Sequence, residues 1–341
     1  MVRKRAIIFF VAAFLATSIS AGILGDAEYR QTVRRIISLR FDHRYAEADS
    51  LTGELAEGYG NDPAIYFLRA SNLHDMMHHR EDFRRTTEME ALLDSAIALA
   101  SADTSDPWNL WIIGSSQGYR ALARAERGEY LPAYRLSRRA YSMLKRAAAH
   151  RETRADALMG MGGYDYWKSA KLGFLVSLPL ISDDREEGAR ALETARDSSV
   201  YSREAALHAL VYVYCEEGDI PSAKEARNLV ADAHPRSLLP LWYDIAIASA
   251  AGNAAEYSTA ADMLLFALDT IGTEQIANIL ELRAMSAEAA AGRDNWEEVC
   301  RHCLALEKLE IPEWTSLAKS EQLELLKDLC EEAEERGFRC R

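Results

Sequence analysis

The sequence is poor in residues that interrupt helices and lacks several common enzyme motifs. Only 18 glycines and 8 prolines occur in 341 residues, and segments that alternate apolar with polar side chains are missing. An all-α chain is therefore expected, because half-buried strands show such alternation. The phosphate loops GxxxxGKS and GxxxxGKT are absent. Two glycine-bearing stretches, 114–118 and 160–163, lack the strand that a nucleophile elbow or a dinucleotide fingerprint requires. We expect neither an enzyme nor a bound cofactor.

Basic residues are fewer than acidic ones. There are 40 Lys and Arg against 53 Asp and Glu, a net charge of -13. Residues 1–21 hold three basic and no acidic side chains, so a chain without them carries -13 - 3 = -16. An acidic surface disfavours binding of nucleic acid or anionic lipid through overall charge. We therefore expect no nucleic-acid partner.

The N-terminus has the order of a secretory signal peptide. Residues 3–5 are basic, the run Ala6–Leu15 is apolar, and small residues follow. The apolar run has about half of the roughly 20 residues that a membrane-spanning helix needs. We predict a signal peptide over residues 1–21 and export to the periplasm or outer membrane, with an uncleaved anchor as the alternative. No cysteine lies near the cut, which argues against a lipid anchor.

The clearest helical hairpin lies between Leu207 and Pro235. Its first helix has apolar residues at helical spacing, at Leu207, Leu210, Val211 and Tyr214. Gly218 supplies the turn, and Ala223 is small where two helices must approach closely. Pro235 cannot continue a helix and ends the unit.

This hairpin resembles the tetratricopeptide repeat, a helix-turn-helix unit of about 34 residues. The matching positions are Leu207, Val211, Tyr214, Gly218, Ala223, Val230 and Pro235. Gly128, Tyr130 and Ala133 repeat the turn spacing. Tyr45 with Ala48 and Tyr257 with Ala260 keep the aromatic-to-alanine spacing without a glycine in register, and Trp296 is followed by Val299. The resemblance implies an α-α superhelix of about six to seven hairpins.

Helix signals place this solenoid over residues 26–312. Asp62-Pro63 and Asp106-Pro107 each combine a capping carboxylate with a proline suited to the first helical turn. The later hairpins are expected at 202–233, 238–271 and 273–309. A C-terminal segment, 313–341, is expected to cap the stack with one helix over 316–336.

An apolar insertion, Leu172–Ile181, interrupts the fourth hairpin. With Pro179 inside, it cannot span a membrane as a helix. It either packs into the solenoid or contacts a partner or a membrane surface. Together with the aromatic helix before it and the acidic restart after it, it resembles exported bacterial proteins of this repeat type, a likeness that brings no activity with it.

The five cysteines all lie late in the chain. We expect Cys215 to be a packed residue of the best hairpin, and a structural disulfide among Cys300, Cys303, Cys330 and Cys340. The sequence leaves the pairing open. Cys300 and Cys303 have the spacing of a redox or metal pair, but no second pair completes a zinc site.

Two groups of side chains are candidates for a site. On a helix His74 and His78 lie one turn apart and could chelate a metal, although Asp75 takes the place of the usual Glu and no third-ligand motif follows. The alternative is a polar helix face. The second group consists of aromatic and neighbouring residues on first helices, which line the inner surface in the family: Trp111, Tyr164, Tyr166, Trp167, His208, Tyr212 and Trp242. The alternative for these is packing between helices.

The leading hypothesis is an exported, non-enzymatic scaffold that binds a protein or peptide through a concave aromatic groove. The observation behind it is the repeat frame joined to a signal peptide. The second hypothesis is a periplasmic small-ligand or metal-binding protein, accessory to a transporter. Its ligand would lie between the histidine face at 74–79 and the insertion at 172–181.

Overall fold

A computed structural model of the chain describes residues 22–171, 183–271 and 273–340. The predicted signal peptide and the apolar insertion lie outside these described residues. Within them the chain is helical and contains no strand, which confirms that the fold is all-α. The first four hairpins are α1 (Arg30–Phe41) with α2 (Tyr45–Tyr59), α3 (Pro63–Arg80) with α4 (Thr86–Ala100), α5 (Pro107–Glu126) with α6 (Tyr130–Ala147), and α7 (Arg154–Lys171) with α9 (Arg185–Ser198).

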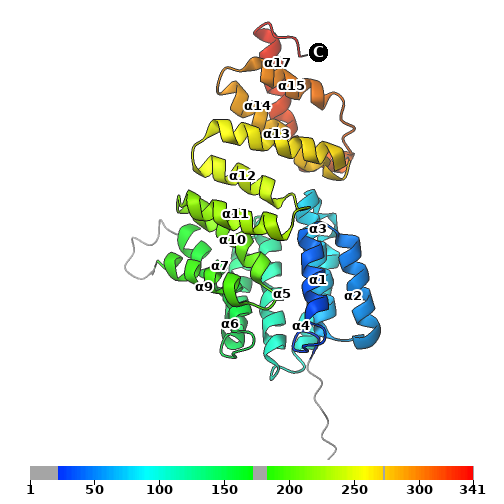
Figure 1. Cartoon of the computed structure of the whole chain (residues 1–341). Helices are drawn as coiled ribbons and strands as arrows, with labels where there is room; N and C mark the ends of the chain where they lie inside the picture. The colour runs from blue at the N-terminus through cyan, green and yellow to red at the C-terminus, as the bar shows by residue number, and fades with distance from the viewer. Residues whose placement is uncertain (1–21, 172–182, 272, 341) are drawn as a thin grey trace, which may run out of the picture.

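The array continues toward the C-terminus in the same way (Figure 1). The remaining hairpins are α10 (Arg203–Glu216) with α11 (Ile220–Ala233), α12 (Leu239–Ala250) with α13 (Ala254–Ile271), and α14 (Ile276–Ala291) with α15 (Trp296–Leu306). Two short 3-10 turns, Phe83–Arg85 and Thr273–Gln275, precede α4 and α14. The capping signals at the start of α3 and α5 are confirmed: Asp62 and Asp106 each accept a backbone N–H, 2.8 Å away in both cases.

Five hairpin turns share one left-handed residue, two positions before the second helix. These residues are His43, Gly128, Gly218, Gly252 and Asp294, with φ between 57° and 73°. In each turn the next N–H donates to a carbonyl five residues back, as Asp219 does to Tyr214 at 2.8 Å. This bond satisfies one of the last carbonyls of the first helix. The same local geometry therefore folds the chain back five times.

The position five residues after the left-handed one packs against the first helix of each hairpin. Buried residues occupy it in four of these hairpins: Ala48, Ala133, Ala223 and Val299. In the α12–α13 hairpin this position is Tyr257, because Gly252 is the left-handed residue. Tyr257 was expected to match Tyr45, but Tyr45 follows its left-handed residue by two positions and Tyr257 follows Gly252 by five. The expected match was therefore wrong by three residues. Gly252 and Tyr257 line part of a pocket of about 310 Å³.

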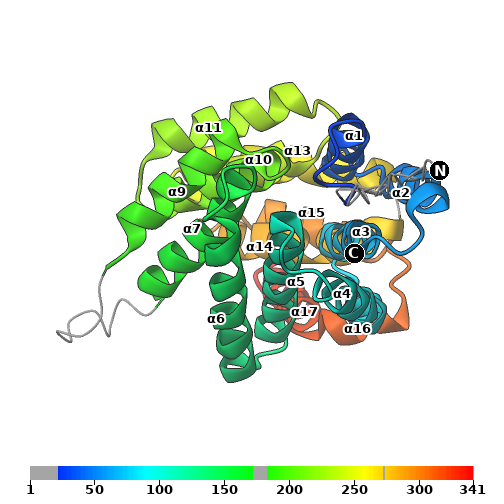
Figure 2. The same ribbon diagram turned by 90° about the horizontal axis from the view of Figure 1, so that it is seen from below.

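The chain curves until its first hairpin meets the α9–α10 and α11–α12 connections (Figure 2). The His43 imidazole accepts the N–H of Leu238 at 2.9 Å, and the Tyr201 hydroxyl donates to the carbonyl of Leu24 at 2.9 Å. α14 also contacts α3, since Asn278 donates to the carbonyl of His79 at 2.7 Å. The first helices of the hairpins therefore face a shared interior.

Two disulfides hold the C-terminal end together. Cys300 pairs with Cys340, and Cys303 pairs with Cys330. The expected final helix is divided at Lys319 into α16 (Glu313–Ala318) and α17 (Ser320–Glu335). Lys319 is buried, and its ammonium group contacts the carboxylates of Glu81 and Glu281. The break therefore joins the last helices to both α3 and α14.

No helix in the described part of the chain has the length and hydrophobicity that crossing a bilayer requires.

Candidate functional site

A cluster of polar side chains is centred on α3. Arg40 of α1 donates from Nη2 to Oδ2 of Asp75 at 2.6 Å, and Oδ1 of Asp75 lies 3.2 Å from Nδ1 of His74. Burial alone would raise the pKa of Asp75, but the guanidinium of Arg40 and the contact with His74 lower it well below its usual range. Asp75 is therefore a carboxylate that contacts the His74 ring at Nδ1.

His74 is held on one ring nitrogen only. Its Nδ1 faces Asp75, while its buried Nε2 has no hydrogen-bond partner among the described residues. The Tyr119 ring packs edge-on against it, with centroids 4.6 Å apart. Burial lowers the pKa of His74, with Asp75 opposing, so the ring is neutral at pH 7. A neutral ring with Nδ1–H held by a carboxylate presents the Nε2 lone pair.

His78 and Glu126 lie beside it. Nε2 of His78 is 3.0 Å from Oε1 of Glu126, and the rings of His74 and His78 are 4.2 Å apart between centroids. Burial lowers the pKa of His78, but the bond and charge of Glu126 outweigh it and leave the pKa raised. One potential ligand atom from each of the three residues lies within 4.8 Å of the others. No local pattern marked Glu126, because only the packing of α5 on α3 brings it close to the histidines.

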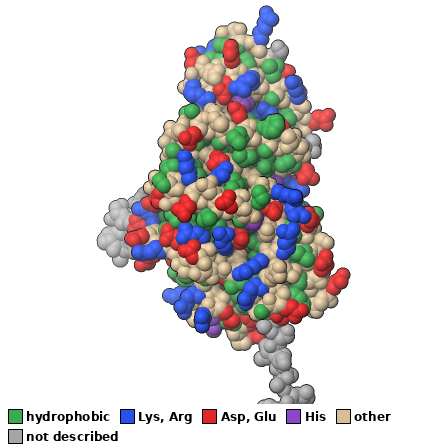
Figure 3. Space-filling model, viewed as in Figure 1, with side chains coloured by type: hydrophobic (Ala, Val, Ile, Leu, Met, Phe, Trp, Pro, Cys, Tyr) green, Lys and Arg blue, Asp and Glu red, His purple; other side chains and the backbone are tan. Residues whose placement is uncertain are grey.

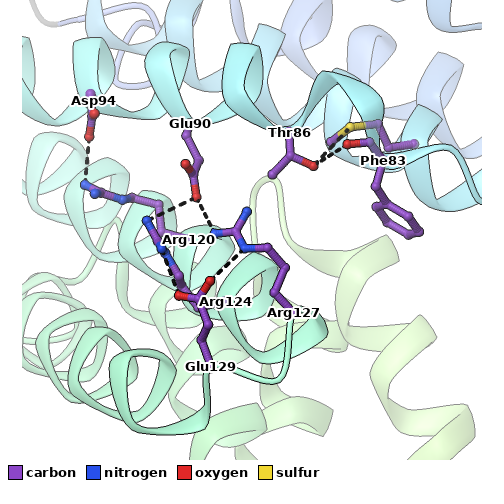
Figure 4. A network of polar contacts seen from close by, with 9 residues as sticks. Phe83, Thr86, Glu90, Asp94, Arg120, Arg124, Arg127 and Glu129 are labelled. Carbon is purple, nitrogen blue, oxygen red and sulfur yellow. Dashed lines mark hydrogen bonds and ion pairs between the residues drawn. The ribbon is translucent and has the colours of Figure 1, made fainter. Parts of the chain in front are cut away.

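A network of ion pairs fixes the end of α5 that carries Glu126 (Figure 4). Glu90 of α4 accepts from Arg127 at 2.9 Å and lies 3.7 Å from Arg124. Arg124 also donates to Glu129 at 2.8 Å, across the turn into α6. These contacts hold the residues on both sides of Glu126 against α4.

Across the interior, α10 and α12 contribute a second polar cluster. Nδ1 of His208 lies 2.7 Å from the hydroxyl of Tyr243, and the rings of His208 and Tyr212 pack edge to face with centroids 5.2 Å apart. Burial lowers the pKa of His208 to about 4, with the charge of Asp75 opposing the shift and that of His78 adding to it. His208 is therefore neutral at pH 7 and faces the same interior as α3.

The expected groove residues are distributed between core and surface. Trp111 and Tyr166 are buried. The Trp111 ring packs against Phe67, and the Tyr166 hydroxyl donates to Glu217 at 2.8 Å. These two side chains hold helices together and do not line an open surface. The others are only partly buried: Tyr164, Trp167, His208, Tyr212 and Trp242.

A larger exposed aromatic surface occurs on α6. Tyr130, Leu131 and Tyr134 expose 74%, 60% and 45% of their area. The exposed Lys and Arg residues of 130–154 continue this surface, which we call the α6 face: Arg135, Arg138, Arg139, Lys145, Arg146, Arg151 and Arg154. Figure 3 shows basic side chains at the lower left, over α6. Tyr164 of α7 adjoins this face through Tyr134. The basic residues between positions 135 and 154, in a chain with a net charge of -13, are the sequence feature that could have indicated this face.

The chain matches no protein-family model, and no curated protein matches it significantly.

Proposed function

We propose that the chain is an exported, non-enzymatic scaffold of the tetratricopeptide-repeat type, which binds an acidic segment of a protein partner on the α6 face. The observation that carries this proposal is the exposure of Tyr130, Leu131 and Tyr134 beside a row of arginines. Tyrosine and arginine are enriched among the residues that dominate binding energy at protein interfaces. Two of the residues expected in the concave groove, Trp111 and Tyr166, are buried, and the proposal is therefore placed on the α6 face.

Charge supports an acidic partner. Residues 130–154 contain seven Lys and Arg and one acidic residue, Glu152, whereas the whole chain carries -13. A local positive surface on a negative protein attracts an acidic segment and orients it during encounter. The exposed tyrosines then supply apolar area that buries on contact. The exposed tyrosines and five of these seven basic residues lie on α6, and Arg151 and Arg154 follow it.

Two further features support the family and the location. The recurring left-handed turn followed by a small buried residue is the arrangement on which the family resemblance rests. Two disulfides fit an oxidising compartment outside the cytoplasm, as does the signal-like N-terminus.

The test compares proteins that co-purify with the mature chain from its native envelope. The variants are wild type, the double variant Arg138→Glu with Arg139→Glu, and the control Arg301→Glu on α15, whose side chain is also exposed. We expect a specific partner with an acidic segment to be retained by wild type and by the control, and lost from the double variant. A synthetic peptide of that segment should then bind wild type with an affinity that falls as salt rises. Equal retention by all three proteins would contradict the proposal, as would binding to anionic vesicles in place of a protein.

A further inference from the structure

We infer that His74, His78 and Glu126 form a binding site for one divalent transition-metal ion of the zinc class. Each of the three residues places a nitrogen or carboxylate oxygen within 4.8 Å of the other two. Ligand atoms about 2.0–2.2 Å from one ion in tetrahedral coordination are about 3.3–3.6 Å apart. A pair at the 4.8 Å bound must therefore close by about 1.4 Å, which side-chain rotation can supply.

The second observation is the way in which His74 is held. Its Nδ1 lies against Asp75, and its Nε2 is buried without a hydrogen-bond partner in the described part of the chain. Metal-ligating histidines typically donate their other ring N–H to a carboxylate, which fixes the ring and raises its basicity. Arg40 fixes Asp75 in turn, at 2.6 Å. The imidazole of His74 is therefore oriented by a carboxylate at Nδ1 and can offer Nε2 to a ligand.

The ligands come from rigid elements. His74 and His78 are one turn apart on α3, and Glu126 ends α5 next to the pairs of Arg124 and Arg127 with Glu90 (Figure 4). The side chains of His78 and Glu126 are 36% and 37% exposed, although Nε2 of His78 is itself buried. Two helices therefore supply all three ligands.

The donor chemistry selects the class of ion. Two imidazoles and one carboxylate suit Zn²⁺ and its neighbours, whereas Mg²⁺ and Ca²⁺ prefer oxygen ligands alone. Three protein ligands leave a coordination position for water or for a group of another molecule. This site shares no residue with the α6 face, so either proposal can be disproved without affecting the other.

Isothermal titration of the untagged mature chain with Zn²⁺ at pH 7.5 tests the inference. We expect one ion per chain. Affinity should fall at least tenfold in His78→Ala and in Glu126→Gln, whose partly exposed side chains can be replaced without opening the core. His74→Ala should abolish binding. His150→Ala, an exposed histidine on the α6–α7 connection, is the matched control and should bind as wild type.

Two further readouts separate a metal site from a simple ion pair between His78 and Glu126. Saturating Zn²⁺ should raise the unfolding midpoint of wild type and of His150→Ala but not of Glu126→Gln, because binding to the folded state adds stability. Mg²⁺ should have no such effect. Absence of Zn²⁺ binding would overturn the inference, and so would binding unchanged in both His78→Ala and Glu126→Gln.

Discussion

Gly162 of α7 and Gly188 of α9 bring two helix backbones into direct contact. A Cβ atom on Gly162 would lie 2.6 Å from the carbonyl oxygen of Gly188, and one on Gly188 would lie 2.7 Å from the backbone nitrogen of Tyr166. Real side chains do not tolerate such distances to backbone atoms. Gly162, in the glycine-bearing stretch 160–163, therefore allows α7 to pack closely against α9.

Gly162→Ala should destabilise the fold by about 2 kcal/mol, because overpacking forces the two helices apart. Gly163→Ala is the control, since a Cβ at that position meets no atom within 4 Å. It should be neutral or slightly stabilising, as alanine favours helix. Denaturant unfolding of both variants measures the difference. Equal effects from the two substitutions would show that α7 and α9 are not packed as described.

Gly218→Ala should cost about 1–2 kcal/mol, because Gly218 has a φ of 72° and a Cβ is strained in the left-handed region. The added methyl group meets no neighbour within 4 Å, so strain is the only cause. Gly58→Ala, within α2 and equally free of contacts, should not destabilise. A Gly218→Ala protein as stable as wild type would contradict the shared turn geometry.

The protein should lose stability as pH falls from 6.5 toward 4. Burial lowers the pKa of His43 from 6.5 to about 4, with Asp75 and Asp42 opposing and His234 adding to the shift. The stacked His79 has its pKa lowered to about 3, by burial and by the charge of His43. Between these values and 6.5 the unfolded chain binds more protons than the folded one, so stability rises with pH. The stability that the two neutral histidines contribute is fully present above pH 6.5, and it is lost progressively as the pH falls from 6.5 through about 4.

The measurement is the unfolding midpoint at several pH values between 7.5 and 4. His43→Asn should show a smaller pH dependence than wild type, and asparagine tolerates the left-handed backbone at this position. His150→Asn, an exposed control, should follow the wild-type curve. If the unfolding midpoint of His43→Asn depended on pH as steeply as that of wild type, the role assigned to His43 would be contradicted.

Peptide mapping without reductant should recover two linked pairs, Cys300 with Cys340 and Cys303 with Cys330, and a free thiol at Cys215. Replacing Cys303 and Cys330 together by serine should reduce stability by about 3 kcal/mol, since the bond closes a loop between residues 27 positions apart. A disulfide between Cys300 and Cys303 would contradict the structure.

Local signals were enough to predict much of the fold. Gly128 and Gly218 lie in the turns that their spacing indicated, and the Asp-Pro pairs at 62–63 and 106–107 begin α3 and α5. His43 and Asp294 take the same conformation without being glycine, so no local signal marked those turns. Helix periodicity and turn chemistry act over a few residues, which is why they could be recognised.

The candidate sites were harder to predict, because they depend on contacts between distant segments. Sequence spacing paired His74 with His78, but Glu126 and Arg40 reach them only after α5 and α1 pack on α3. Aromatic side chains also look alike in sequence whether they pack or bind. Tyr166 is buried and Tyr130 is largely exposed, a difference that only the folded chain decides.

Photo-cross-linking tests the partner-binding account most directly. A photoreactive phenylalanine analogue is placed at Tyr134 on the α6 face, or at Glu225 on the exposed side of α11, in the full chain expressed in its native host. The account predicts a covalent adduct at position 134 with one protein that has an acidic segment, and no such adduct at position 225. The same adducts at both positions, or none at position 134, would contradict it.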